Sequence, residues 1–172
     1  MSETKNPPVE AQPVEPAKKS KEMQAAEALQ KRFSTAVEEV LEQHGDVIVY
    51  VKRAQIDEVC KYLRDEPSMK FDLLSDLTGL DRGVDEEPRF EVVYQIRSLP
   101  NRMRLRLKVR VDEEDCHAPT LSEVWKTANW HERETFDLFG IHFDGHPDLR
   151  KILTPDDLEG HPLRKDFPLR GY

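Results

Sequence analysis

Four histidines in the last third of the chain are the first candidates for chemistry, because neutral imidazole is a common metal ligand. They are His131, His142, His146 and His161. His142 and His146 lie four positions apart, but Gly145 and Pro147 flank the second of them, so no helix can align the pair. The sequence has no HExxH or CxxC element to complete a site. We expect this chain to bind no metal, with a histidine-based metal hydrolase as an alternative.

Three carboxylates, Glu132, Glu134 and Asp137, lie close enough in sequence to be considered as an acid and a base. A simpler interpretation is that the two glutamates stabilise the positive N-terminus of a helix and that Arg133 and Asp137 form an i,i+4 ion pair. No glycine-rich phosphate loop follows a predicted strand, and no nucleophile elbow is present. The sequence therefore predicts no catalytic and no cofactor-binding residue.

One predicted strand carries a basic face, on which Arg102, Arg104, Arg106, Lys108 and Arg110 alternate with apolar residues. An RNA-binding sheet would add stacking aromatic residues and an excess of positive charge. This face has no aromatic residue, and the chain has a net charge of −8. We expect no nucleic acid as partner, and either a solvated face with cross-strand partners such as Glu91 or a surface that docks an acidic partner.

The elements that would position these residues follow from hydrophobic periodicity. Apolar residues recur at helical spacing over 23–43 and 54–64, and the segments 47–51 and 71–80 are predicted as strands. Strict alternation over 90–97 and 103–111, joined by a short Pro-Asn turn, predicts an antiparallel hairpin.

Two capping boxes predict two short helices after the hairpin. Thr120 and Glu123 open the first helix, while Asn129 and Glu132 open the second. The second helix has its predicted stop at Gly140, since glycine commonly ends a helix.

Together these elements predict a single α+β domain with a mixed or antiparallel sheet and helices packed on it. The 172 residues divide into a disordered tail over 1–22, the folded domain over 23–141 and an extended partner-docking arm over 142–172. Apolar runs are too short for a membrane helix, and two cysteines are too few to ligate an iron–sulfur cluster. The N-terminus carries no signal or transit peptide pattern, so we expect a cytoplasmic protein.

Three linked motifs follow one another in the last third of the chain. They are ERETFDLFGI over 132–141, GHPDLR over 145–150 and GHPLRKDFPL over 160–169. In this order they resemble the C subunit of proton-pumping NADH–quinone oxidoreductase, respiratory complex I, and the likeness extends loosely back to about residue 30. Because the chain ends soon after the third motif, it is similar to the separate form of the C subunit and not to the form fused to the neighbouring D subunit. The equivalent component of a membrane-bound hydrogenase-type complex is the nearest alternative.

The resemblance implies a non-catalytic structural subunit of the peripheral arm, in a complex that transfers electrons from NADH to quinone and translocates protons. It implies that FMN and iron–sulfur clusters belong to other subunits and that this chain contacts the D and B subunits. The chain would reach the membrane only indirectly, on the cytoplasmic side of the bacterial inner membrane. A long arm that gains order on its partner fits this role.

The motif residues that we expect to dock partners supply charges, apolar anchors and turns. Plain core packing is the other interpretation of the two phenylalanines, and a solvated tail is the other interpretation of the arm residues. The predicted docking residues are Glu132, Arg133, Glu134, Phe136, Asp137, Phe139, Gly140, His146, Pro147, Asp148, Arg150, Arg164, Lys165 and Asp166.

Overall fold

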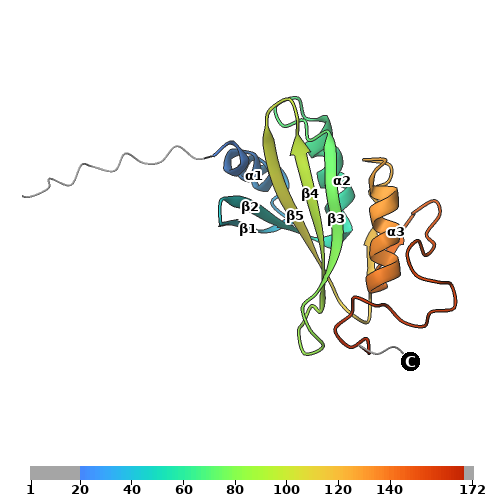
Figure 1. Cartoon of the computed structure of the whole chain (residues 1–172). Coiled ribbons are helices and arrows are strands. Elements are labelled where there is room, and N and C mark those ends of the chain that lie inside the picture. The colour runs from blue at the N-terminus through green and yellow to red at the C-terminus, as the bar shows by residue number, and fades with distance from the viewer. Residues whose placement is uncertain (1–19, 169–172) are drawn as a thin grey trace, which may run out of the picture.

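A computed structural model describes residues 20–168 of the chain (Figure 1). Three helices are present in this part, α1 (Lys21–Arg32), α2 (Ile56–Asp65) and α3 (Ala128–Phe139), with a 3-10 turn (Arg53–Gln55) leading into α2. The strands are β1 (Val37–Gln43), β2 (Asp46–Val51), β3 (Leu73–Asp81), β4 (Phe90–Ser98), β5 (Met103–Val111), β6 (His117–Pro119) and β7 (His142–Asp144).

The main sheet has five strands in the order β1-β2-β5-β4-β3, and β6 pairs with β7 in a separate two-stranded sheet. Strands β2 and β5 run parallel, whereas the other neighbours in the main sheet are antiparallel. This arrangement confirms the prediction of one α+β domain with a mixed sheet. The β4–β5 hairpin is also confirmed, because each residue of β4 pairs in unbroken register with β5, from Phe90 opposite Val111 to Ser98 opposite Met103.

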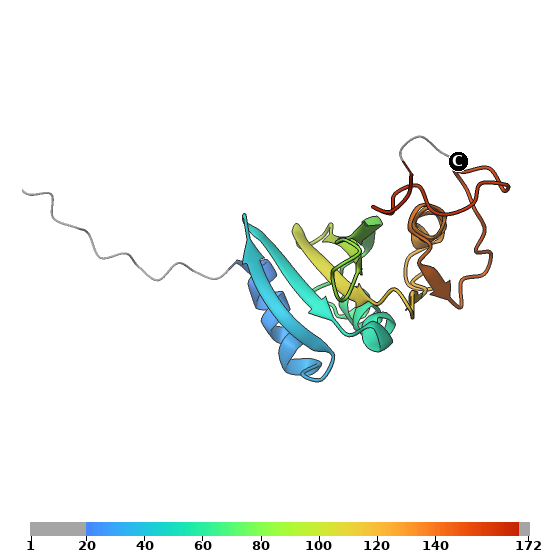
Figure 2. The ribbon, with the colours of Figure 1, turned by 90° about the horizontal axis from the view of Figure 1, so that it is seen from below.

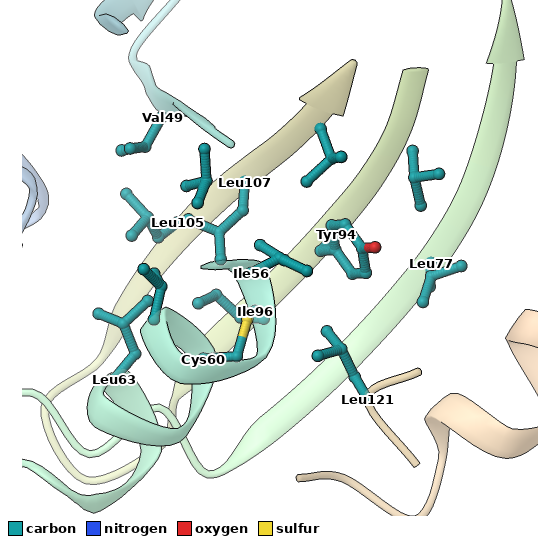
Figure 3. Packing of buried hydrophobic residues seen from close by; sticks show 14 of the residues in the cluster. Val49, Ile56, Cys60, Leu63, Leu77, Tyr94, Ile96, Leu105, Leu107 and Leu121 are labelled. Atoms are coloured by element: carbon teal, nitrogen blue, oxygen red, sulfur yellow. The ribbon is translucent and has the colours of Figure 1, made fainter. Parts of the chain in front are cut away.

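The hydrophobic core lies between one face of the main sheet and the helices. From α2, Ile56, Cys60 and Leu63 are fully buried. Ile56 points toward Leu107 and Tyr94 of the sheet, and Cys60 lies beside Ile96 (Figure 3). Cys60 therefore packs as a small apolar side chain. Helix α3 lies beside β3, and the arm that follows it passes around the helix (Figures 1 and 2).

The opposite face of the main sheet, which we call the open sheet face, carries predicted basic side chains of β5 together with acidic partners from neighbouring strands. Arg102, predicted on the same strand face, lies instead in the turn between β4 and β5, with a positive φ. Lys108 Nζ lies 2.7 Å from Glu91 Oε2, and Arg106 Nη2 lies 3.1 Å from Asp46 Oδ2. Arg110 pairs with the carboxylates of β1. The prediction of cross-strand partners such as Glu91 is confirmed.

The predicted helix over 23–43 is wrong at both ends. Helix α1 already begins at Lys21, where the Ser20 hydroxyl accepts a hydrogen bond from the Met23 N–H, so residues 21 and 22 are not tail. The helix ends at Arg32, and residues 37–43 form β1 because they pair with β2 across a turn at His44 and Gly45, both with positive φ. A register shift near Val37 breaks the alternation that would have revealed this strand. Residues 1–19 of the predicted tail lie outside the described part.

The predicted helix after Thr120 is also wrong, because residues 120–127 form turns between β6 and α3. Side chains in these turns bond to backbone carbonyls at the start of β3 and just before it, instead of capping a helix. Trp125 Nε1 donates to the Phe71 carbonyl at 3.1 Å, and the Thr127 hydroxyl donates to the Leu74 carbonyl at 3.2 Å. The short strands β6 and β7 were not predicted, since three residues are too few for a visible alternation.

No helix between residues 20 and 168 is long and apolar enough to cross a membrane.

Candidate partner-docking site

Most of the predicted docking residues lie on α3 and on the arm over 145–168, and many of them bond to one another. We call this network the α3–arm contact. Its largest element is Asp137, a buried carboxylate that accepts backbone N–H groups of Ile152, Leu153 and Thr154 at 3.0, 2.7 and 2.9 Å, together with the Thr154 hydroxyl. Burial raises the pKa of Asp137, but these four donors outweigh burial and lower it to about 2. A charged carboxylate therefore holds the arm against α3.

Arg133 bonds to the arm in the opposite sense, as a donor. Its Nε donates to the Arg150 carbonyl at 3.3 Å, and its guanidinium lies 5.0 Å from the centre of the Trp130 ring. The predicted ion pair of Arg133 with Asp137 is wrong, because both side chains form hydrogen bonds with backbone groups of the arm instead.

Glu132 is fully buried and tethers the turn that precedes α3. Its carboxylate accepts the Leu121 N–H at 2.6 Å and the Thr120 hydroxyl. Burial raises the pKa of Glu132 to about 7, against the lowering effect of these two bonds. The prediction that Glu132 and Asn129 form a capping box is wrong: the helix has Thr127 at its N-cap, and Glu132 reaches back to residue 121 instead.

His146 lies beside Glu132 with a fully buried side chain. Its Nδ1 accepts the Asp148 N–H at 3.0 Å, so its Nε2 carries the proton that is donated to the Asn129 carbonyl at 3.1 Å. The Nε2 atom lies 3.9 Å from Glu132 Oε2. This histidine fixes the start of the arm on α3 and has no free nitrogen for a metal ion.

The C-terminal end of α3 is capped by the arm. Gly140 adopts the left-handed conformation at φ 73°, as its predicted role as the stop requires, and its N–H donates to the Phe136 carbonyl. A Cβ atom here would collide with His161 and lie 2.8 Å from Arg164 Nη2. The next three carbonyls, which a helix leaves unpaired, accept bonds from the arm: Asp137 from His161 Nδ1, Leu138 from the Leu163 N–H and Phe139 from Arg164 Nε.

A second anchor of the arm is the ion pair of Arg89 with Asp81, whose side chains are 3% and 2% exposed. Asp166 accepts from Arg89 Nη2 at 2.6 Å, and the Lys165 N–H donates to Asp81 Oδ2 at 2.8 Å. Burial raises the pKa of Asp81, but its bonds, first of all the one from Arg89, lower it overall. Sequence analysis missed this pair. Asp81 takes a position in the alternation of β3 that points to the core, which is a signal for a buried partner.

The remaining predicted docking residues divide by exposure. Phe139 is buried and packs on Gly79, where a Cβ atom would lie 2.7 Å from the ring, so it belongs to the core. Phe136 is half-buried, and its ring is nearly perpendicular to the His142 ring, at 87°. The exposed members are Glu134, Pro147, Asp148 and Arg150.

Three large apolar side chains on α3 and the arm also face solvent, although sequence analysis did not single them out. Trp130 is 61% exposed, Leu153 62% and Leu163 52%. Large exposed apolar groups beside ordered charged groups are typical of protein–protein interfaces.

Solved structures share this fold, two of them with the following likeness to this chain. The trypsin-resistant fragment (1–134) of Nqo5 is 34% identical and matches with a TM-score of 0.63, covering 74% of this chain and 100% of the fragment. A component of the archaeal membrane-bound sulfane sulfur reductase, a respiratory membrane complex, is 21% identical and matches with a TM-score of 0.72 over 87% of both chains, which shows the fold alone. The class defined by this fold is a single α+β domain with a mixed five-stranded sheet.

Sequence relatives identify the family within this class. The second NADH-quinone oxidoreductase C subunit of Rhizobium meliloti is 51% identical over 81% of this chain and 76% of its own length, and the C subunit of Geobacter sulfurreducens is 47% identical over 83% and 87%. The profile of the respiratory-chain NADH dehydrogenase 30 kDa subunit matches residues 49–172. The chain belongs to this family, whose bacterial relatives are named as the C subunit of NADH–quinone oxidoreductase. The resemblance carried by the three motifs is confirmed.

Proposed function

We propose that the chain is a non-catalytic docking subunit, which binds the D and B subunits of its complex through the outer side of α3 and the arm. The observation that carries this proposal is the α3–arm contact, in which buried charges hold an irregular segment of 24 residues, from 145 to 168, on the domain. An arm ordered in advance loses less conformational entropy on binding, so more of its contact energy contributes to affinity.

The outer side of this contact offers a suitable interface. Trp130 and Leu153 supply apolar area, while Arg150, 71% exposed at its side chain, supplies a planar donor for carboxylates. Tryptophan and arginine are enriched among the residues that dominate binding energies. The guanidinium of Arg133 stacks on Trp130 and bonds to the Arg150 carbonyl, so these residues are held as one surface.

In this proposal the chain holds no FMN, iron–sulfur cluster or quinone, and other subunits transfer electrons from NADH to quinone and translocate protons. Both cysteines are free thiols, and Cys60 is buried in the core. The chain sits peripherally on the cytoplasmic side of the bacterial inner membrane. The names of the relatives, as one lettered component of a larger oxidoreductase, support this assignment.

The test is a double substitution, Trp130→Ala with Leu153→Ser, in a tagged chain purified from gently solubilised membranes. We expect a folded chain by circular dichroism whose recovery of the D and B subunits falls more than about tenfold, because each lost interface anchor costs about 2 kcal/mol. The matched control is Leu99→Ser, since Leu99 is 61% exposed but lies in the turn between β4 and β5.

Full recovery of both subunits by the double variant would show that α3 and the arm are not the docking surface. NADH–quinone activity of the purified complex separates this assignment from a hydrogenase-type complex. A Glu134→Gln complex that assembles fully but turns over slowly would contradict the non-catalytic role.

A further inference from the structure

Two histidines that are far apart in sequence meet on the two-stranded sheet of β6 and β7. The parallel register places His117 opposite His142 and Pro119 opposite Asp144. The Nδ1 atoms of His117 and His142 lie 3.0 and 3.3 Å from the same oxygen, Asp144 Oδ1, and their ring centres are 4.9 Å apart. All three side chains are exposed, at 48%, 48% and 58%.

The two distances from the histidine nitrogens to Asp144 Oδ1 are close to the spacing of donor atoms around a small metal ion. Ligand bonds of about 2.0–2.1 Å in a tetrahedral Zn²⁺ site place neighbouring donor atoms about 3.3 Å apart. One ligand atom from each of the three residues lies within 4.8 Å of the others. Two imidazoles and one carboxylate suit a transition metal better than Ca²⁺ or Mg²⁺, which prefer oxygen ligands.

The carboxylate of Asp144 is available as a ligand for such an ion. Within residues 20–168, no lysine or arginine forms an ion pair with it, and its charge partners are the two histidines. The imidazole protons now shared with Asp144 would move to the Nε2 atoms, leaving both Nδ1 atoms as ligands. The main-chain bonds of β6 and β7 already hold the donors together, which lowers the entropic cost of forming the site.

We propose that His117, His142 and Asp144 form a binding site for a divalent transition metal ion such as Zn²⁺. Three protein ligands leave a fourth position for water or another ligand. A cleft of about 280 Å³, lined in part by Arg53, His117 and Asp144, lies beside the site and gives room for this ligand. The bound ion would link β6 to β7 and stabilise the two-stranded sheet. This inference does not depend on the docking role of α3 and the arm.

The test uses the full chain, freed of metal with a chelator and titrated with ZnCl₂ by calorimetry, with the bound metal counted after dialysis. We expect one Zn²⁺ per chain. His117→Ala, His142→Ala and Asp144→Asn should each weaken binding more than about tenfold, since even removal of an outer-shell partner costs 10–100-fold. His44→Asn is the matched control, because His44 is an exposed histidine in the β1–β2 turn and asparagine tolerates its positive φ.

Circular dichroism of each variant establishes that the fold is intact. The visible spectrum of the Co²⁺ form provides a second measurement of a four-coordinate site. Absence of saturable Zn²⁺ binding would overturn the proposal, as would equal affinity in the parent and the three ligand variants. Weakening by His44→Asn as large as that by His142→Ala would do the same.

Discussion

The α3–arm contact and the open sheet face are both rich in arginine and carboxylate side chains, but they use these charges differently. On the open sheet face, side chains pair with side chains across strands, and the pairs of Arg110 remain in contact with water: Arg110 is 37% exposed, and its partners Glu38 and Glu39 are 33% and 43% exposed. In the α3–arm contact, buried side chains pair mainly with backbone groups, as Asp137 does.

This difference decides how much each charge stabilises the protein. Exposed ion pairs gain little, because water screens the charges and the side chains lose conformational freedom. A buried carboxylate that satisfies several backbone donors is costly to remove, since the donors stay buried without a partner. The same residue types therefore act as a solvated surface in one region and as a structural connection in the other.

The largest expected effect is that of Asp137→Ala, which removes the acceptor of three N–H groups and one hydroxyl. We expect the free energy of unfolding to fall by about 4 kcal/mol, and the arm to become sensitive to trypsin. Urea denaturation and limited proteolysis measure both. The control is Asp148→Ala on the arm, whose carboxylate is 57% exposed. Equal stability of the two variants would mean that the buried network does not differ from surface pairs.

The next effect concerns pH and Glu132. Its pKa is about 7 in the folded protein, against an ordinary value of 4.5. Between pH 4.5 and about pH 7, the folded state therefore keeps a proton on Glu132 that the unfolded state has released. This raised pKa contributes stability that is complete below about pH 4.5 and is lost as pH rises to about 7, a span of about 3 kcal/mol. Glu132→Gln should remove this slope.

Urea midpoints of the parent and Glu132→Gln, measured from pH 5 to pH 8, give the slope by difference. Glutamine can still accept the Leu121 N–H and donate to the Thr120 hydroxyl, so the bonds are kept while the titration is removed. Glu134→Gln, exposed on the same helix, is the control. Parallel curves for the parent and Glu132→Gln would exclude a stabilising proton on this carboxyl.

Gly140→Ala tests the end of α3. A Cβ atom is strained at φ 73° and collides with His161 of the arm, so we expect a loss of about 2 kcal/mol in thermal or urea unfolding. Gly45→Ala provides a control with positive φ and open space, which isolates the backbone strain. An equal loss in both variants would mean that contact with the arm adds nothing.

The smallest effect is expected on the open sheet face. Arg110→Ala removes two exposed ion pairs and a guanidinium 4.1 Å from the centre of the Tyr50 ring. We expect a loss of about 0.5 kcal/mol that shrinks further in about 0.5 M salt. A loss as large as that of Asp137→Ala would remove the distinction between the two regions.

Local patterns were sufficient for the elements that bury one regular face. Helix α2 and the β4–β5 hairpin were predicted because Ile56, Val59, Cys60 and Leu63 repeat at helical spacing and residues 90–97 alternate without interruption. Strand β1 was missed because its register shift disturbs the alternation. Thr120 and Glu132 were assigned to helix caps, since sequence spacing does not reveal that they bond to each other across the turn.

The sequence by itself determined the α+β class, the alternating hairpin with its basic face, the stop of α3 at Gly140 and, through three motifs, the family. These features depend on residues near one another in the chain, where backbone geometry limits the possible arrangements. Only the tertiary structure decided that Asp137 holds residues 152–154, that Arg89 and Asp81 anchor the arm and that His117 meets His142. Partners of buried charges depend on which distant segments pack together, and periodicity carries no information about that choice.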